Sequence, residues 1–176
     1  MRKVAVLLMV SLAAAWAATA PLVQRMLPAR DAVKGFAPVA DSVQYGKGDD
    51  LTKIYNGGYE LYTKNGVVDA ARQLYQRKSD YVEVTIHTMK SKKTAADFLG
   101  YWQKQHKVVT LTRSGDSRSF LVTKPNVMSF SITGTYFATV SAFHAPEQAV
   151  ADVRAFTSAV EKSIRKLAPK PPKGKN

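Results

Sequence analysis

The chain has 176 residues, no cysteine, and 26 lysine and arginine residues against 13 aspartate and glutamate residues, for a formal net charge of +13. The lack of cysteine excludes disulfides, thiolate nucleophiles and a lipid-attachment cysteine. The length suits one domain, and the positive charge favours anionic partners.

The first twenty residues are typical of a secretory signal peptide. Arg2 and Lys3 precede the apolar run VAVLLMVSLAAAWAATA, which is short for a bilayer span and ends in small residues. Cleavage fits after Ala17 or after Ala20, and retention as a membrane anchor is the alternative. We predict an exported protein, periplasmic or extracellular, without a retained transmembrane helix. Loss of Arg2 and Lys3 leaves a net charge of 24 − 13 = +11.

Export makes nucleic acid an unlikely partner and favours three others. These are an anionic envelope polymer, a lipid surface and an acidic protein. The alternative interpretation is that the scattered lysines only keep the protein soluble.

Residues 21–48 are predicted to form an irregular lead-in. Prolines and glycines, among them Pro28 and Pro38, interrupt any long hydrophobic period there. We expect Phe36 and Val39 to pack against the domain.

A helix is predicted next, from Leu51 to Lys64. Asp49 or Asp50 can cap its first turn, and Asn65-Gly66 supplies a left-handed residue that ends it. At 3.6 residues per turn, three tyrosines form a stripe along one side.

Two glycines in the interior of this helix cost roughly 1 kcal/mol each relative to alanine. They indicate either a close approach to the backbone or a break in the helix. The approaching group is a packed strand in one interpretation and a ligand in the other. In the second interpretation the candidate binding residues are Tyr55, Asn56, Gly57, Gly58, Tyr59, Glu60 and Tyr62.

Residues 67–76 and 81–88 are predicted to be antiparallel strands joined by a turn at 77–80. In the second strand, apolar residues such as Val84 alternate with polar ones such as Thr85 and His87. This alternation predicts a sheet that is covered on one face only.

Ser91 can cap a second helix, over residues 93–105, with Phe98 and Trp102 on its buried side. Four further strands are predicted, over residues 108–112, 119–123, 127–133 and 135–143. A third helix opens at Pro146, and its predicted buried positions are Ala149, Val153, Phe156, Val160, Ile164 and Leu167. Residues 169–176 are predicted to be a basic, disordered tail.

The run Asn56-Gly57-Gly58, then Glu60-Leu61-Tyr62 and Gly66, resembles a family of secreted bacterial proteins known only as a domain of unknown function. Its signature is a helix that reads I-N-G-G-A-E-L-Y. Here Tyr55 stands in place of the isoleucine and Tyr59 in place of the alanine. The resemblance covers about residues 47–99 and implies compartment and fold rather than chemistry.

The order of elements predicts an α+β domain over residues 49–168, with a single antiparallel sheet of about six strands packed by about three helices. Its layout is loosely similar to that of the PsbP and Mog1 proteins, in element order only.

The sequence contains no recognisable catalytic constellation. We therefore predict that the protein is not an enzyme and holds neither a cofactor nor a metal. His87, His106 and His144 are far apart in the sequence and are interpreted as surface residues. We therefore predict a non-catalytic envelope module for binding or interaction. The alternative is a small-ligand carrier with a cleft beside Asn56-Gly57-Gly58.

Overall fold

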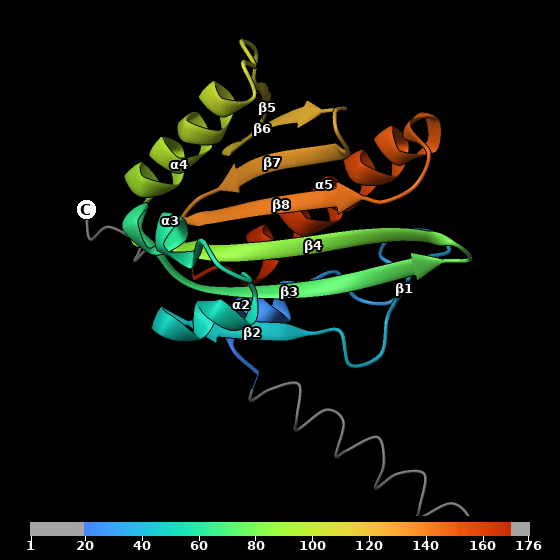
Figure 1. Ribbon diagram of the computed structural model, residues 1–176, viewed down its shortest axis with the longest axis horizontal. Coiled ribbons are helices and arrows are strands. Elements are labelled where there is room, and N and C mark those ends of the chain that lie inside the picture. The colour runs from blue at the N-terminus through green and yellow to red at the C-terminus, as the bar shows by residue number, and fades with distance from the viewer. Residues whose placement is uncertain (1–19, 170–176) are drawn as a thin grey trace, which may run out of the picture.

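A computed structural model describes residues 20–169, which form an antiparallel sheet with helices on both faces (Figure 1). The α+β class and the single antiparallel sheet predicted from the sequence are confirmed. The proposed signal peptide and the basic tail lie outside the described residues, except for Ala20 and Pro169 at their borders.

The helical segments are α2 (Leu22–Arg25), the 3-10 helix η1 (Gly48–Lys53), α3 (Tyr59–Lys64), α4 (Lys92–Gln105) and α5 (Pro146–Leu167). The strands are β1 (Ala37–Pro38), β2 (Gln44–Lys47), β3 (Val67–Arg77), β4 (Asp80–Met89), β5 (Thr112–Ser114), β6 (Ser117–Val122), β7 (Val127–Thr133) and β8 (Tyr136–Ala142). The sheet has the order β1-β3-β4-β8-β7-β6-β5, and β2 also pairs with β3.

The sheet is covered on both faces, so the prediction of one covered face is wrong. Val84 points toward α5 and α2, where a first apolar cluster lies. The opposite face carries a second cluster beneath α4, α3 and η1. Thr85 and His87, which alternate with Val84 on β4, are 4% and 0% exposed. Alternation in the sequence indicated two chemically different faces, but a polar residue on the second face is buried wherever a helix covers it.

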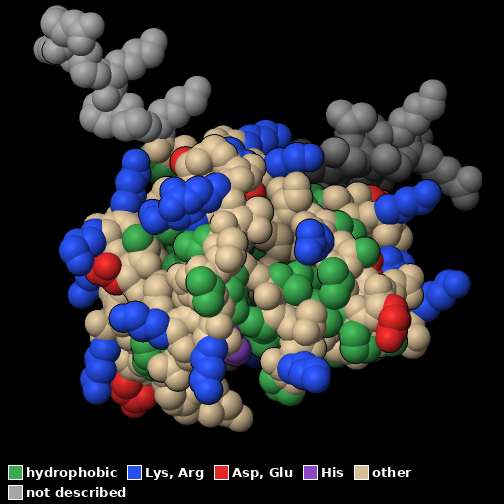
Figure 2. Space-filling view, turned by 90° about the horizontal axis from the view of Figure 1, so that it is seen from above, with side chains coloured by type: hydrophobic (Ala, Val, Ile, Leu, Met, Phe, Trp, Pro, Cys, Tyr) green, Lys and Arg blue, Asp and Glu red, His purple; other side chains and the backbone are tan. Residues whose placement is uncertain are grey.

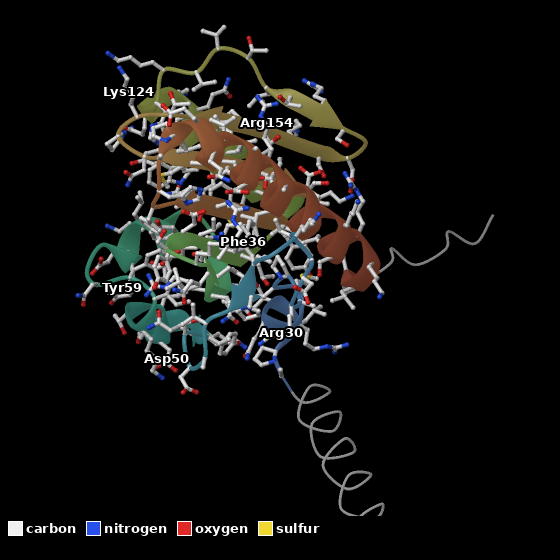
Figure 3. The ribbon with its side chains drawn as sticks, turned by 90° about the vertical axis from the view of Figure 1, so that its right-hand side faces the viewer. Arg30, Phe36, Asp50, Tyr59, Lys124 and Arg154 are labelled. Carbon is white, nitrogen blue, oxygen red and sulfur yellow. The ribbon has the colours of Figure 1, made fainter. Side chains whose placement is uncertain are left out.

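The predicted irregular lead-in is also wrong, because residues 22–47 contribute α2, β1 and β2 to the fold. Phe36, labelled in Figure 3, is 1% exposed and packs edge-on against Phe156 of α5 with 5.1 Å between ring centroids. The hydroxyl of Tyr75 donates a hydrogen bond to the carbonyl of Pro28 at 2.8 Å. The packed domain therefore begins well before residue 49.

A close backbone approach occurs at Gly46 on β2. A Cβ atom at this position would lie 2.3 Å from the carbonyl oxygen of Asp50 and 2.9 Å from Cα of Leu51. Only glycine lets η1 fold back directly onto β2.

Both long helices begin where the sequence predicts. The Ser91 side chain accepts the Thr94 backbone N–H at 3.1 Å, and the Thr94 hydroxyl accepts the Ser91 N–H at 2.9 Å, which together form a capping box. Pro146 opens α5, and Phe156 is among the residues that α5 buries at the predicted spacing. The strand predicted at 108–112 is wrong, since β5 starts only at Thr112.

Candidate functional site

The helix predicted over residues 51–64 is interrupted, because η1 ends at Lys53 and α3 begins only at Tyr59. Gly57 and Gly58 adopt φ angles of +88° and +75°, a left-handed conformation that is unfavourable for residues with a side chain. A Cβ atom at either glycine would meet nothing within 4 Å. The pair is therefore explained by the reversal of the chain, and the alternative of a close approach is wrong.

The predicted ending of this helix at Gly66 is observed, whereas its predicted start is not. Gly66 has a φ of +88°, as the predicted left-handed ending requires. At the start, η1 follows Lys47 without a side-chain cap, so the predicted aspartate cap is wrong. Asp49 and Asp50 lie inside the first turn of η1, where a negative charge still complements the positive end of the helix.

The reversal of the chain stacks two of the tyrosines against a histidine on the sheet. Tyr55 and Tyr62 lie parallel with 3.7 Å between ring centroids, and Tyr62 lies parallel to His87 at 5.5 Å. Beyond His87, Phe98 of α4 and Phe137 of β8 continue the aromatic packing at 4.8 Å from each other. These five side chains form what we call the aromatic layer.

The hydrogen bonds of His87 fix its tautomer. Nδ1 lies 3.0 Å from the carbonyl oxygen of Phe137, which can only accept, so Nδ1 carries the proton. Nε2 then accepts the hydroxyl of Tyr55. Burial lowers the pKa of His87 to about 4, and the bond to Phe137 opposes this shift only in part. Burial also raises the pKa of Tyr55 well above its ordinary value. Both groups are neutral at physiological pH.

The seven candidate binding residues thus separate into two sets. Tyr55 and Tyr62 belong to the aromatic layer, and Tyr59 is half-buried beside it. The other four are exposed on the turn or on the first turn of α3: Asn56, Gly57, Gly58 and Glu60. Tyr55 and Tyr62 are occupied in supporting the fold, and a ligand could reach only the exposed set.

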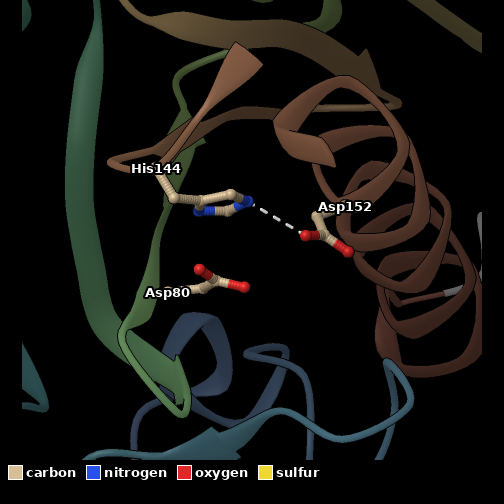
Figure 4. A group of neighbouring side chains, drawn as sticks. All are labelled: Asp80, His144 and Asp152. Atoms are coloured by element: carbon tan, nitrogen blue, oxygen red, sulfur yellow. Dashed lines mark hydrogen bonds and ion pairs between the residues drawn. The ribbon is translucent and has the colours of Figure 1, made fainter. Parts of the chain in front are cut away.

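A second cluster, at the opposite end of β4, joins residues that are far apart in the sequence (Figure 4). Oxygen and nitrogen atoms of Asp80, His144 and Asp152 all lie within 4.8 Å of one another, from the β3–β4 hairpin, the segment after β8, and α5. The His144 Nε2 lies 3.0 Å from a carboxylate oxygen of Asp152. The interpretation of all three histidines as surface residues is wrong for His87, and the His144 side chain is only 7% exposed.

These ligand types could hold a metal ion, but an arginine already supplies the positive charge. The Arg77 guanidinium donates to Asp152 at 2.9 Å and 2.5 Å and to Asp80 at 3.0 Å. The guanidinium carbon of Arg77 also lies over the Phe36 ring, 4.3 Å from its centroid. A cation bound between the carboxylates would have to displace this guanidinium, so the arrangement is that of a structural ion cluster.

Two cavities lie against α5, away from Asn56-Gly57-Gly58. One, of about 340 Å³, lies at the C-terminal end of α5 and includes Thr133, Tyr136 and Arg165 in its lining. The other, of about 300 Å³, lies between α5 and the β5–β7 part of the sheet, where Arg154 and Glu161 are among the lining residues. Burial raises the pKa of Glu161, which lies 3.6 Å from the Arg165 guanidinium.

The end of the molecule around β5 and β6 combines positive charge with apolar groups. Between Asp97 and Glu147 the sequence has one acidic residue, Asp116, and five basic ones: Lys104, Lys107, Arg113, Arg118 and Lys124. Asp116 is paired with Arg165 at 3.1 Å. We call the surface formed by residues 104–126 the basic end.

Two figures show the upper end of the molecule as it is oriented in Figure 1. Figure 2 views the molecule from above and shows hydrophobic side chains gathered in the middle of the face, with lysine and arginine side chains around them. Figure 3 places Lys124 at the upper end of the molecule, whereas Asp50 and Tyr59 lie toward the lower end.

The sequence did contain a signal for the basic end, which the sequence analysis did not use: residues 98–146 include a single acidic residue, Asp116. By contrast, no pattern in the sequence indicates that Arg77 contacts Asp152.

Three comparisons with known proteins were made. No family model matches the chain, and no curated protein matches it. A solved structure, the extracellular domain of PknH from Mycobacterium tuberculosis, aligns with a TM-score of 0.42 at 11% identity, over 73% of this chain and 86% of that chain. No helix within residues 20–169 is both long enough and apolar enough to cross a membrane.

Proposed function

We propose that this protein is an exported, non-catalytic module of the cell envelope that binds an anionic partner through its basic end. The observation that carries the proposal is the concentration of five basic residues over residues 104–126, beside the exposed side chain of Val109. Scattered basic residues would suit a solubilising coat, but five of them in a stretch with one acidic residue suit a surface that attracts an anionic partner.

The two histidine clusters support the non-catalytic part of the proposal. His87 is fully buried, and both its ring nitrogens are engaged. The Asp152 carboxylate is held by Arg77 as well as by His144. A general acid or base must reach a substrate proton, and neither histidine has a free nitrogen with which to do so.

The proposal is tested by titrating the mature protein with a soluble polyanion, polyglutamate, and separately with an anionic surface, vesicles that contain phosphatidylglycerol. Binding to at least one should weaken steeply between low and moderate salt, because the screening length falls from about 30 Å at 0.01 M to about 10 Å at 0.1 M. Neutral dextran and phosphatidylcholine vesicles serve as controls. Binding that does not depend on salt, or no binding to either polyanion, would contradict the proposal.

A small-ligand carrier is the second candidate, and the cavities favour it. Volumes of about 300 and 340 Å³ fall at the lower limit for small-molecule sites. Both cavities border α5, so a carrier would hold its ligand there and not beside Asn56-Gly57-Gly58. A library of small metabolites screened by thermal shift would decide, since a carrier gains stability when its ligand binds. Substitution of Thr133 by a bulkier residue should abolish that gain if the larger cavity is the site.

A further inference from the structure

The segment between α4 and β5 presents one valine outward from an anchored backbone. Val109 is 92% exposed, the highest exposure among the large hydrophobic residues of the described chain. Its neighbours Val108 and Leu111 are half-buried and pack against the cluster beneath α4. The Val108 N–H donates to the carbonyl of Gln103 at 3.0 Å, and the Gln103 amide donates to the carbonyl of Val109 at 3.3 Å.

The segment around Val109 is held in place, so the exposure of this side chain does not result from a lack of contacts. Packing on both sides and two hydrogen bonds hold the segment, and they aim the valine away from the core. Leaving an apolar side chain in water forfeits the free energy that burial would provide. A partner that removes this side chain from water would recover that free energy.

Positive charge surrounds this valine at short sequence distance. Lys104, Lys107 and Arg113 are exposed on the same segment or at its borders. Figure 1 places the segment between α4 and β5 at the extreme upper end of the molecule, so it protrudes. A protruding apolar side chain flanked by cations fits an anionic lipid surface, where the headgroups neutralise the charges and the acyl boundary accepts the side chain.

We propose that residues 104–113 dock the protein on an anionic lipid bilayer, with Val109 entering the interface and Lys104, Lys107 and Arg113 contacting lipid phosphates. The inference rests on the proposed function and names its partner. A soluble polyanion would use the same cations but would give Val109 no apolar surroundings. The effect of substituting Val109 therefore distinguishes binding to a lipid surface from binding to a soluble polymer.

The test is co-sedimentation of the mature protein with phosphatidylcholine vesicles that contain or lack phosphatidylglycerol, in parallel with a titration of soluble polyglutamate. Val109→Ser should weaken vesicle binding up to roughly tenfold and leave polyglutamate binding unchanged. Lys107→Gln should weaken vesicle binding roughly fivefold. Val43→Ser and Lys34→Gln are matched controls, since Val43 is 39% exposed and Lys34 is exposed in the segment before β1.

Each outcome decides the inference. Vesicle binding that needs phosphatidylglycerol and is reduced by Val109→Ser, but not by Val43→Ser, supports it. Binding to polyglutamate without binding to vesicles overturns the lipid surface and leaves the anionic module standing. Binding to neither overturns both proposals. Vesicle binding that is equal in Val109→Ser and in the unaltered protein overturns the docking segment. Thermal melts of every variant identify any loss caused by unfolding.

Discussion

His87 and His144 lie toward opposite ends of the β4–β8 pair, and the groups that surround the two imidazole rings differ in kind. His87 sits in the aromatic layer, where Tyr55 and Phe137 satisfy it without any charged partner. His144 sits among charges, with Asp152 at one nitrogen and the carbonyl of Tyr81 at 3.3 Å from the other. Both side chains are almost fully buried, so burial alone does not decide what a histidine does.

The difference lies in what replaces water around each ring. At His87, aromatic faces and neutral hydrogen bonds replace it, and the neutral imidazole is favoured. At the other end, two carboxylates and the Arg77 guanidinium replace it, and the charges compensate one another. Neither environment leaves a nitrogen free, which is why both histidines are assigned structural roles.

The largest effect is expected from removing the cation of the charged cluster. Arg77→Met leaves Asp152, whose side chain is 9% exposed, without its bidentate partner. Removing one partner of a buried ion pair costs about 3 to 5 kcal/mol, and His144, which still contacts Asp152 at 3.0 Å, keeps the loss toward the lower end of that range. The free energy of unfolding in urea measures this loss, and Lys162→Met on the exposed side of α5 is the control. A loss below 1 kcal/mol would mean that the cluster does not stabilise the fold.

The pH dependence of stability tests the other histidine. The pKa of His87 is about 4 in the folded protein and 6.5 in an unperturbed chain, so between these values only the unfolded state takes up the proton. His87 therefore contributes its full stability above pH 6.5, and up to about 3 kcal/mol is lost as the pH falls through 4.

Urea unfolding at pH 7 and pH 5, for the unaltered protein and for His87→Phe, isolates this contribution from that of the carboxylates. The difference between the two proteins should shrink as the pH falls. An NMR titration of the His87 ring is a second readout, and a midpoint near 6.5 would refute the assignment of a buried, neutral ring.

The hydroxyl of Tyr55 is tested by Tyr55→Phe. The ring stays in the stack, but Nε2 of the buried His87 loses its donor, which costs about 1 to 3 kcal/mol. Tyr59→Phe, in a half-buried tyrosine outside the stack, should change stability by less than about 0.5 kcal/mol. Equal melting curves for the two variants would show that the hydrogen bond to His87 contributes nothing.

The smallest effect is expected at the turn that carries Tyr55 to Tyr62. Gly58→Ala forces a side chain into a left-handed conformation and should cost about 1 to 2 kcal/mol, although the space around it is open. Gly100→Ala is the matched control, because Gly100 lies inside α4, also in open space. That substitution should stabilise by about 0.5 to 1 kcal/mol. A stabilising Gly58→Ala would remove the conformational explanation of the glycine pair.

Part of the candidate site followed from the sequence and part did not. The sequence singled out the Tyr55–Tyr62 stretch as unusual, since glycines at such positions require a reason. The sequence could not give that reason, because a helix with an internal Gly-Gly and a helix broken by Gly-Gly have the same hydrophobic period. The target of the tyrosines, His87, lies on a strand whose alternation assigned it to an open face.

The sequence by itself determined the elements whose signals are local: the capped start of α4 at Ser91, Pro146 at the start of α5 and the left-handed Gly66. Those signals act through backbone hydrogen bonds and φ angles within a few residues. Tertiary structure alone decided which polar residues are buried. Arg77 meets Asp152 and Tyr55 meets His87 only because the helices cover both faces of the sheet. Contacts between distant residues depend on that packing, and no pattern along the chain encodes them.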